Sequence, residues 1–287
     1  MLPAIYVPDG YSISYVELDN VKVVGTNKGG TTERGFTIHS GANLSYLVIN
    51  NCIFANMSYG IDIYKTSVAY ASTFVDYVTI TNSTFDHNCI KGIYAEKLSN
   101  ATFNNVTVTN NGDADVVPSW AKPWNAGIDI NLKFGNYQNL VFSDLTVANN
   151  GLGSEHGVGL TVKARDDGGY STNPATLVNV TIIGGTFTGN EKGIRVGEVG
   201  KNNAGPTNVV IKYASIYGNV HSGVVNEAQA EVNATYNYWG NATGPYHQTT
   251  NTCASGDNVS DNVDYTPWLD APYPGGQPRS FNVFIDS

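Results

Sequence analysis

The segment Gly127-Ile128-Asp129-Ile130 is one of seven in which a glycine precedes a short alternating run. The other six share this form: Gly35-Phe36-Thr37-Ile38, Gly60-Ile61-Asp62-Ile63, Gly92-Ile93-Tyr94-Ala95, Gly157-Val158-Gly159-Leu160, Gly193-Ile194-Arg195-Val196 and Gly223-Val224-Val225-Asn226. A recurring unit predicts a repeat architecture, because one unit cannot bury its apolar face alone and must stack on its neighbours. We therefore expect a coil of about eight turns, with Ile61, Ile93, Ile128, Val158 and Ile194 stacked inside it as one column.

A second pattern keeps step with the first. An apolar residue is followed three places later by asparagine in Phe85/Asn88, Val108/Asn111, Val147/Asn150, Phe187/Asn190 and Ile216/Asn219, with Met57 in the asparagine position after Phe54 and Asn241 closing the series after Tyr238. Asparagine tolerates left-handed backbone and suits tight bends. Stacked in successive coils, these side chains should form a hydrogen-bonded ladder.

The spacing of these markers is uneven, and the excess falls in four insertions. They are residues 67–72, 112–125, 165–176 and 200–206. All four border the glycine-led strand, so we expect them to wall one lateral face of the coil. Long loops on one side of a regular scaffold usually carry binding or catalysis.

Composition favours an all-β chain. There are 31 glycines, and only 14% of residues are charged. The net charge is −9 without a basic cluster, which argues against nucleic acid as a partner. No apolar stretch is long enough to predict a membrane span. We expect a monomer with a parallel β-helix over residues 1–241 and a C-terminal cap and tail over 242–287. The tail resembles a linker, which suits a larger multidomain chain.

The chain start gives no targeting signal, since residues 1–4 lack a charged and apolar leader. We interpret Met1 as a start that does not mark the natural N-terminus, and we expect an extracellular or cell-surface protein. Cys52, Cys89 and Cys253 are too few for a disulfide framework, so buried thiols are expected.

The coil pattern over about residues 10 to 241 resembles the right-handed parallel β-helix superfamily, the pectin-lyase-like repeat proteins. Its end, Asn237-Tyr238-Trp239-Gly240 followed by Gly244-Pro245, is similar to the closing motif of prokaryotic and archaeal surface-associated β-helix proteins. The resemblance implies the fold. The motifs of polygalacturonases are absent, and Tyr59-Gly60-Ile61-Asp62 begins like a mannuronan epimerase motif and then diverges.

Alternation along the strands places polar residues on the outside of the coil. One outward column reads Thr37, Asp62, Tyr94, Asp129, Gly159, Arg195 and Val225, and a second reads His39, Tyr64, Glu96, Asn131, Thr161, Gly197 and Glu227, with Lys65, Lys97, Lys133 and Lys163 just beyond. Carboxylates, tyrosines, amides and lysines thus share the face that the insertions border.

Three carboxylates of this face are candidate catalytic residues: Asp62, Glu96 and Asp129. Strand geometry puts Asp62 about 10 Å and Glu96 about 8 Å from Asp129. Inverting glycosidases hold their carboxyls about 6.5–9.5 Å apart. A carboxyl crowded by other carboxyls has a raised pKa, as a general acid needs. We therefore predict a glycoside hydrolase acting on an extracellular polysaccharide, with Asp129 essential and Asp129→Asn leaving the fold intact.

Candidate substrate-binding residues surround these carboxylates. Two tryptophans lie in a proline-stiffened loop before Asp129, and aromatic faces stack on pyranose rings. One of them is expected to anchor the loop on the coil. The full set is Tyr64, Tyr94, Trp120, Trp124, Asn131, Lys133, Lys163, Tyr170 and Arg195. No Cys/His spacing predicts a zinc site, and no cofactor is expected, although Asp166-Asp167 could take Ca²⁺.

Two other functions fit the sequence. A polysaccharide lyase would use Lys133 or Lys163 to abstract the C5 proton, with Arg195 and Ca²⁺ neutralising the uronate; the net charge of −9 argues against a polyanionic substrate. A non-catalytic surface module would present its loops for adhesion or carbohydrate binding. Fold alone does not choose among the three.

Overall fold

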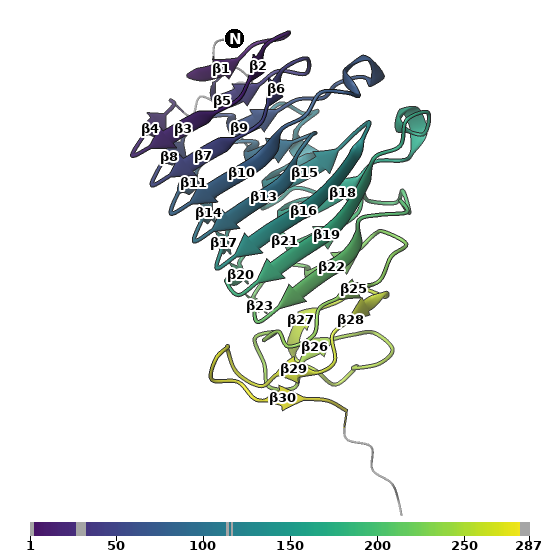
Figure 1. Cartoon of the computed structure of the whole chain (residues 1–287). Helices are drawn as coiled ribbons and strands as arrows, with labels where there is room; N and C mark the ends of the chain where they lie inside the picture. Colours follow the sequence, from purple (N-terminus) through teal and green to yellow (C-terminus); the bar gives the residue numbers. More distant parts are fainter. Residues whose placement is uncertain (1–2, 27–32, 113–114, 116, 282–287) are drawn as a thin grey trace, which may run out of the picture.

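Three long parallel sheets wind along the chain in the computed structural model, which describes residues 3–26, 33–112, 115 and 117–281 (Figure 1). The first sheet has eight strands: β1 (Ile5–Val7), β5 (Arg34–Ile38), β9 (Tyr59–Ile63), β12 (Lys91–Ala95), β15 (Ala126–Leu132), β18 (Val158–Ala164), β21 (Lys192–Val196) and β24 (Ser222–Asn226). The second sheet has nine: β3 (Val16–Asp19), β7 (Leu47–Asn50), β10 (Asp76–Thr81), β13 (Ser99–Asn104), β16 (Asn136–Ser143), β19 (Thr176–Ile183), β22 (Thr207–Lys212), β25 (Val232–Asn233) and β28 (Val263–Asp264).

The third sheet has seven short strands: β4 (Lys22–Val24), β8 (Ile53–Ala55), β11 (Thr84–Asp86), β14 (Thr107–Thr109), β17 (Thr146–Ala148), β20 (Thr186–Thr188) and β23 (Ser215–Tyr217). One strand of each sheet makes one coil, so consecutive strands of a sheet come from consecutive coils. The right-handed parallel β-helix predicted from the sequence is therefore confirmed. No helix in the described part of the chain is both long and apolar enough to cross a membrane.

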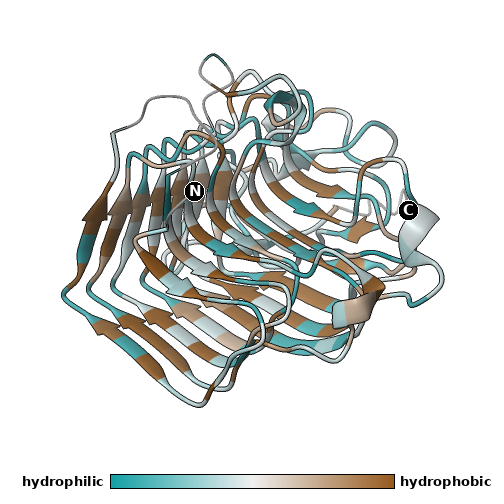
Figure 2. Cartoon of the chain, turned by 90° about the horizontal axis from the view of Figure 1, so that it is seen from above, coloured by the Kyte–Doolittle hydropathy of each residue, from teal (hydrophilic) through white to brown (hydrophobic). Residues whose placement is uncertain are grey.

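Buried apolar side chains from the three sheets form one core cluster. In Figure 2, the hydropathy colouring alternates between hydrophobic and hydrophilic residues along the strands of the coils. Phe54 stacks on Phe85 with ring centroids 5.3 Å apart, and Phe103 stacks on Phe142 at 4.8 Å. Apolar residues in register on neighbouring strands thus continue the core from one coil to the next.

The interior column of the first sheet differs from the prediction at one coil. Ile61, Ile93 and Ile128 align as expected, but Leu160 follows them and Val158 pairs with Ala126. The reason is the stacked glycine, which is Gly159 and not Gly157. A Cβ on Gly159 would lie 2.8 Å from the Gly193 carbonyl oxygen, so only glycine fits there.

The corrected register moves two outward positions. Thr161, not Gly159, stands beside Asp129 in the first outward column. Lys163 pairs with Asn131, so it belongs to the second outward column, where Thr161 was expected. This shift brings the Lys163 ammonium group next to the candidate carboxylates.

The asparagine ladder is present. Asn88, Asn111, Asn150, Asn190 and Asn219 each donate from Nδ2 to the next side chain along the coil at 2.8–3.0 Å. The ladder ends on Asp257, not on Asn241, whose side chain accepts from Thr243 instead.

The left-handed backbone lies one residue before each ladder position. His87, Asn110 and Asn149 have φ of 51°, 55° and 57°, and the ladder asparagines that follow them are not among the positive-φ residues. The ladder residues are therefore selected for their side-chain hydrogen bonds and not for backbone conformation.

Residues 242–281 continue the coil end and close it. They form β26 (Pro245–Tyr246), β27 (Gly256–Asn258) and the antiparallel pair of β29 (Trp268–Leu269) and β30 (Pro278–Arg279), and β28 joins the second sheet through β25. A short pair, β2 (Ser12–Ile13) and β6 (Asn43–Leu44), lies near the other end. The domain boundary at residue 241 stays a prediction.

Three 3₁₀ turns lie in the insertions: η1 (Val68–Tyr70), η2 (Lys122–Trp124) and η3 (Gly168–Tyr170). Cys52 and Cys89 are buried as expected, whereas Cys253 is exposed.

Candidate functional site

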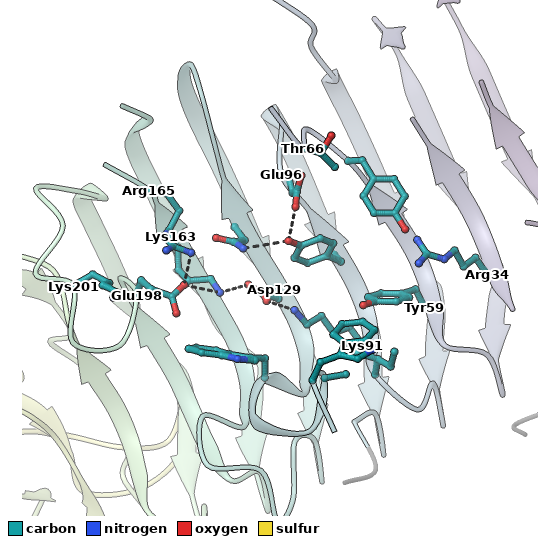
Figure 3. Close-up of a pocket in the computed structure, with 17 residues that line it drawn as sticks. Arg34, Tyr59, Thr66, Lys91, Glu96, Asp129, Lys163, Arg165, Glu198 and Lys201 are labelled. Atoms are coloured by element: carbon teal, nitrogen blue, oxygen red, sulfur yellow. Dashed lines mark hydrogen bonds and ion pairs between the residues drawn. The ribbon is translucent and has the colours of Figure 1, made fainter. Parts of the chain in front are cut away.

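A pocket of about 440 Å³ lies over the first sheet and is called the central pocket here. Strands β5, β9, β12, β15 and β18 form its floor, and residues 120–124 and the segments after β18 and β21 form its rim (Figure 3). Its lining residues are Arg34, Tyr59, Tyr64, Thr66, Ile90, Lys91, Tyr94, Glu96, Trp120, Ala121, Trp124, Asp129, Asn131, Lys163, Arg165, Glu198 and Lys201.

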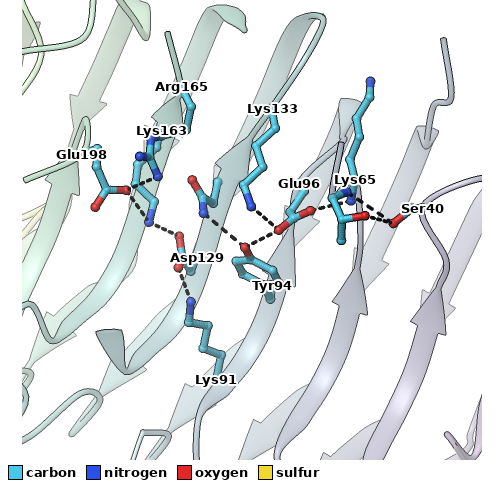
Figure 4. Close-up of polar contacts among 12 residues, drawn as sticks. Ser40, Lys65, Lys91, Tyr94, Glu96, Asp129, Lys133, Lys163, Arg165 and Glu198 are labelled. Atoms are coloured by element: carbon cyan, nitrogen blue, oxygen red, sulfur yellow. Dashed lines mark hydrogen bonds and ion pairs between the residues drawn. The ribbon is translucent and has the colours of Figure 1, made fainter. Parts of the chain in front are cut away.

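A chain of alternating charges crosses the pocket floor (Figure 4). Asp129 Oδ2 is 2.5 Å from Lys91 Nζ, and its Oδ1 is 2.8 Å from Lys163 Nζ. Lys163 Nζ also lies 3.3 Å from Glu198 Oε2, which Arg165 Nη1 approaches to 3.2 Å. Asp129, Lys91 and Lys163 are buried, so these ion pairs are little screened by water.

This series of alternating charges keeps Asp129 ionised. Burial alone would raise its pKa, but the Lys163 and Lys91 ammonium groups outweigh burial and lower the pKa of Asp129 well below its usual value. The raised pKa that the sequence predicted for a crowded carboxyl, with no residue named for it, is therefore not found at Asp129. Burial of Lys163 lowers its own pKa, although its carboxylate partners Asp129 and Glu198 favour the charged form.

Glu96 forms the second polar centre. Tyr94 donates its hydroxyl to Glu96 Oε1 at 2.7 Å, and the Lys133 ammonium group contacts the same oxygen. Asn131 Nδ2 donates to the Tyr94 hydroxyl at 3.2 Å. Glu96, Tyr94 and Asn131 line the central pocket, as the outward columns predicted.

Asp62 does not line the central pocket. It is fully buried under Arg34, whose guanidinium contacts its carboxylate. Burial and the Glu96 charge raise the pKa of Asp62, while the Lys91 charge acts in the opposite direction. Asp62 is thus placed to hold Arg34, and substrate in the central pocket does not reach it.

The tryptophan loop forms one wall. Trp120 is 61% exposed and Trp124 37%, and both line the central pocket. Trp124 packs against the His156 ring, with ring centroids 4.3 Å apart, and Ala121 is buried in a small cluster with Tyr59, Cys89 and Ile90. Trp120 is the more exposed of the two indole rings.

Three predicted binding residues lie outside the central pocket. Lys133 Nζ sits 5.4 Å from the Tyr170 ring centre, and Arg165 lies over the same ring at 4.7 Å, so Tyr170 supports the rim cations from behind. Arg195 is buried and donates to the His156 carbonyl oxygen at 2.8 Å. Tyr64 and Lys163 line the pocket as predicted.

Sequence reasoning missed seven polar lining residues: Arg34, Tyr59, Thr66, Lys91, Arg165, Glu198 and Lys201. Arg34, Tyr59 and Lys91 form one column of the sheet, immediately before the stacked glycines. Strict alternation would turn that column inward with Ile61 and Ile93, so the pattern hid it. The sequence signal that could have revealed this column is its residue type, because polar residues occupy positions where alternation predicts apolar core residues.

The predicted calcium ligands are already engaged. Asp166 and Asp167 accept from Asn203 Nδ2, and Asp167 also accepts from Arg165. Within residues 3–26, 33–112, 115 and 117–281, no group of three or more His, Cys, Asp or Glu side chains is arranged to hold a metal ion.

Comparison with known proteins adds little. No protein-family model and no curated protein sequence matches the chain. Among solved structures, the A-module of the mannuronan C-5 epimerase AlgE4 from Azotobacter vinelandii is similar at 16% identity and a TM-score of 0.43, over 91% of this chain and 70% of that one. A likeness of this extent says nothing about activity.

Proposed function

We propose that the protein binds an acidic polysaccharide, a polyuronate, in the central pocket and cleaves it by β-elimination. The observation that carries this proposal is the local charge. Five cationic side chains line the central pocket (Arg34, Lys91, Lys163, Arg165 and Lys201) against three carboxylates (Glu96, Asp129 and Glu198), although the whole chain has a net charge of −9. The field within a cleft depends on the groups that line it, so net charge does not argue against a polyanion here.

The reaction needs a base for the C5 proton and a group that protonates the leaving oxygen. Lys163 is the candidate base, because its Nζ lies on the pocket floor between Asp129 and Glu198, and burial lowers its pKa in spite of these carboxylates. It removes the C5 proton, the electron pair forms the C4–C5 double bond, and the C4–O4 bond breaks. The Tyr94 hydroxyl, held by Glu96, can supply the proton to O4.

The remaining cations have a binding role. Lys91 keeps its proton: burial opposes its charge, but Asp129 prevails and raises the pKa of Lys91. Its charge, with that of Arg34, favours a uronate carboxylate and stabilises the anion that forms when C5 loses its proton. Trp120 and Trp124 supply ring faces for the sugar.

Hydrolysis fits the central pocket less well. A glycosidase needs one carboxyl that carries a proton near neutral pH. Asp129 is held ionised by two lysines, and Glu96 contacts the Lys133 ammonium group. Asp62, whose pKa is raised, lies outside the pocket.

The test is an activity assay on polygalacturonate, alginate and a neutral glucan. We expect ultraviolet absorbance from unsaturated ends with a polyuronate and no product from the glucan. Lys163→Met should abolish the product, while Lys22→Met, far from the pocket, should not. If the assay detects new reducing ends without unsaturated ends, the protein is a hydrolase and not a lyase. Binding without cleavage would favour a surface module. An extracellular or cell-surface location remains part of this proposal.

A further inference from the structure

A second pocket adjoins the central pocket toward the N-terminal end of the first sheet. This N-terminal pocket has a volume of about 350 Å³ and is lined by Pro3, Tyr6, Arg34, Thr37, His39, Ser40, Tyr64 and Thr66. Arg34, Tyr64 and Thr66 line both pockets, so the two are parts of one groove across β1, β5 and β9. Figure 3 shows Arg34 and Thr66 at the N-terminal side of the central pocket.

The chemistry of the N-terminal pocket differs from that of the central pocket. Tyr6 is 45% exposed and meets the His39 ring edge-on, with centroids 6.3 Å apart; His39 meets Tyr64 in the same way at 6.3 Å. Three rings thus line a space whose one arginine, Arg34, is shared with the neighbour. Rings with few charges suit the apolar face of a pyranose.

Buried polar atoms in this pocket have no protein partner. Thr37 is 3% exposed and Arg34 8%. Within the described part of the chain, neither Thr37 Oγ1 nor Arg34 Nε has a hydrogen-bond partner. A buried polar group without a partner is costly, and native proteins retain few of them. Sugar hydroxyls would satisfy both atoms.

The imidazole of His39 is fixed in place. Asp9 Oδ1 lies 2.9 Å from His39 Nδ1, and the same oxygen accepts the Gly41 backbone N–H at 2.6 Å. With Nδ1 engaged, Nε2 is the nitrogen left for a ligand. The N-terminal pocket therefore has fixed polar groups as well as rings.

From these observations we infer that the N-terminal pocket is a second sugar-binding subsite, which takes a further pyranose unit of the chain whose reacting unit occupies the central pocket. This inference rests on the proposed polysaccharide function and names the form of its substrate: a chain lying along the coil axis, long enough to span both pockets. The unit in the N-terminal pocket is recognised by its ring face and hydroxyls, with Arg34 serving the boundary between the two units.

Two variants test the subsite. Thr37→Val keeps the shape and removes a hydroxyl that has no protein partner, so the fold should be unaffected. Tyr6→Ala removes one exposed ring. Thr161→Val is the matched control, because Thr161 Oγ1 is equally buried and unpartnered within the described residues and lines neither pocket.

Binding is read from tryptophan fluorescence on rapid mixing with short and long oligogalacturonates, before any turnover. We expect wild-type affinity to rise with chain length, and each variant to bind long chains roughly fivefold more weakly while short chains are unaffected. Equal affinity of wild type and both variants for long chains would overturn the subsite. If the protein binds long chains but forms no unsaturated product, the subsite stands and only the lyase reaction fails; no binding of any oligomer overturns both.

Discussion

Replacing Asp129 by Asn should destabilise the protein and not only inactivate it. The substitution is isosteric, and on an exposed face it would cost little. The structure instead buries Asp129 between Lys91 Nζ and Lys163 Nζ, at 2.5 and 2.8 Å. Our expectation from the sequence, an intact fold after Asp129→Asn, ignored these two contacts.

The magnitude follows from what is left behind. Breaking a buried ion pair by removing one partner costs about 3–5 kcal/mol, because the other charge stays buried without compensation. Lys163 keeps Glu198 Oε2 at 3.3 Å, so Lys91 bears most of the loss. We expect the free energy of unfolding of Asp129→Asn to fall by about 3–5 kcal/mol at neutral pH.

The pH dependence has a defined sign. The pKa of Asp129 is lower in the folded state than its ordinary value of 3.8. Its contribution is therefore present above the unfolded-state pKa and is lost as pH falls through the folded-state pKa. The difference in stability between wild type and Asp129→Asn should be constant near neutral pH and shrink only in acid.

Urea unfolding followed by circular dichroism measures these free energies. Asp270→Asn is the control, because the ion pair of Asp270 with the exposed Arg279 is screened by solvent and should contribute little. Adding Lys91→Met to Asp129→Asn should recover part of the loss, since the unpaired charge is removed. A variant Asp129→Asn as stable as wild type at neutral pH would refute the buried charge chain.

Three further variants test other parts of the structure. Asn150→Ala removes the oxygen that accepts from the backbone N–H and the side-chain amide of Asn111, and it should lower the free energy of unfolding by about 3 kcal/mol. Asn50→Ala, on the outer surface, should cost less than about 1 kcal/mol; urea unfolding measures both. Gly159→Ala should lower the melting temperature because its Cβ meets a backbone carbonyl, whereas Gly169→Ala, with nothing within 4 Å, should not. Trp120→Ala should weaken polyuronate binding in a fluorescence titration without changing the melting temperature, since the ring is 61% exposed.

The fold was predictable because two independent sequence patterns mark each coil of the repeat. Stacked glycines and the asparagine ladder each mark the coil, and the two agree. The register failed only where Gly157 and Gly159 both satisfied the pattern. Which of them stacks depends on the carbonyl of Gly193 in the next coil, a tertiary contact that one coil's sequence does not contain.

The candidate site was predictable only where strict alternation holds. Tyr94, Asp129 and Asn131 lie on the outer face because they occupy alternate positions of regular strands. Lys91 comes just before the stacked glycine and still reaches the pocket, so alternation misplaced it inside. Glu198 lies after β21, where no strand period applies, and its contact with Lys163 was invisible in the sequence.

The overall charge was the least informative feature for function, and the reason is structural. A β-helix has a large lateral surface, and of the 24 Asp and Glu residues of the chain only Glu96, Asp129 and Glu198 line the central pocket. In the central pocket each carboxylate contacts a cation, while Arg34 Nε and Asn131 Oδ1 lack a hydrogen-bond partner in the described part of the chain. Burying these two atoms without a hydrogen-bond partner costs free energy of desolvation. A ligand with both carboxylates and hydroxyls would offset this cost by supplying the partners. A polyuronate has both groups on every unit, and a neutral glycan has only one of them.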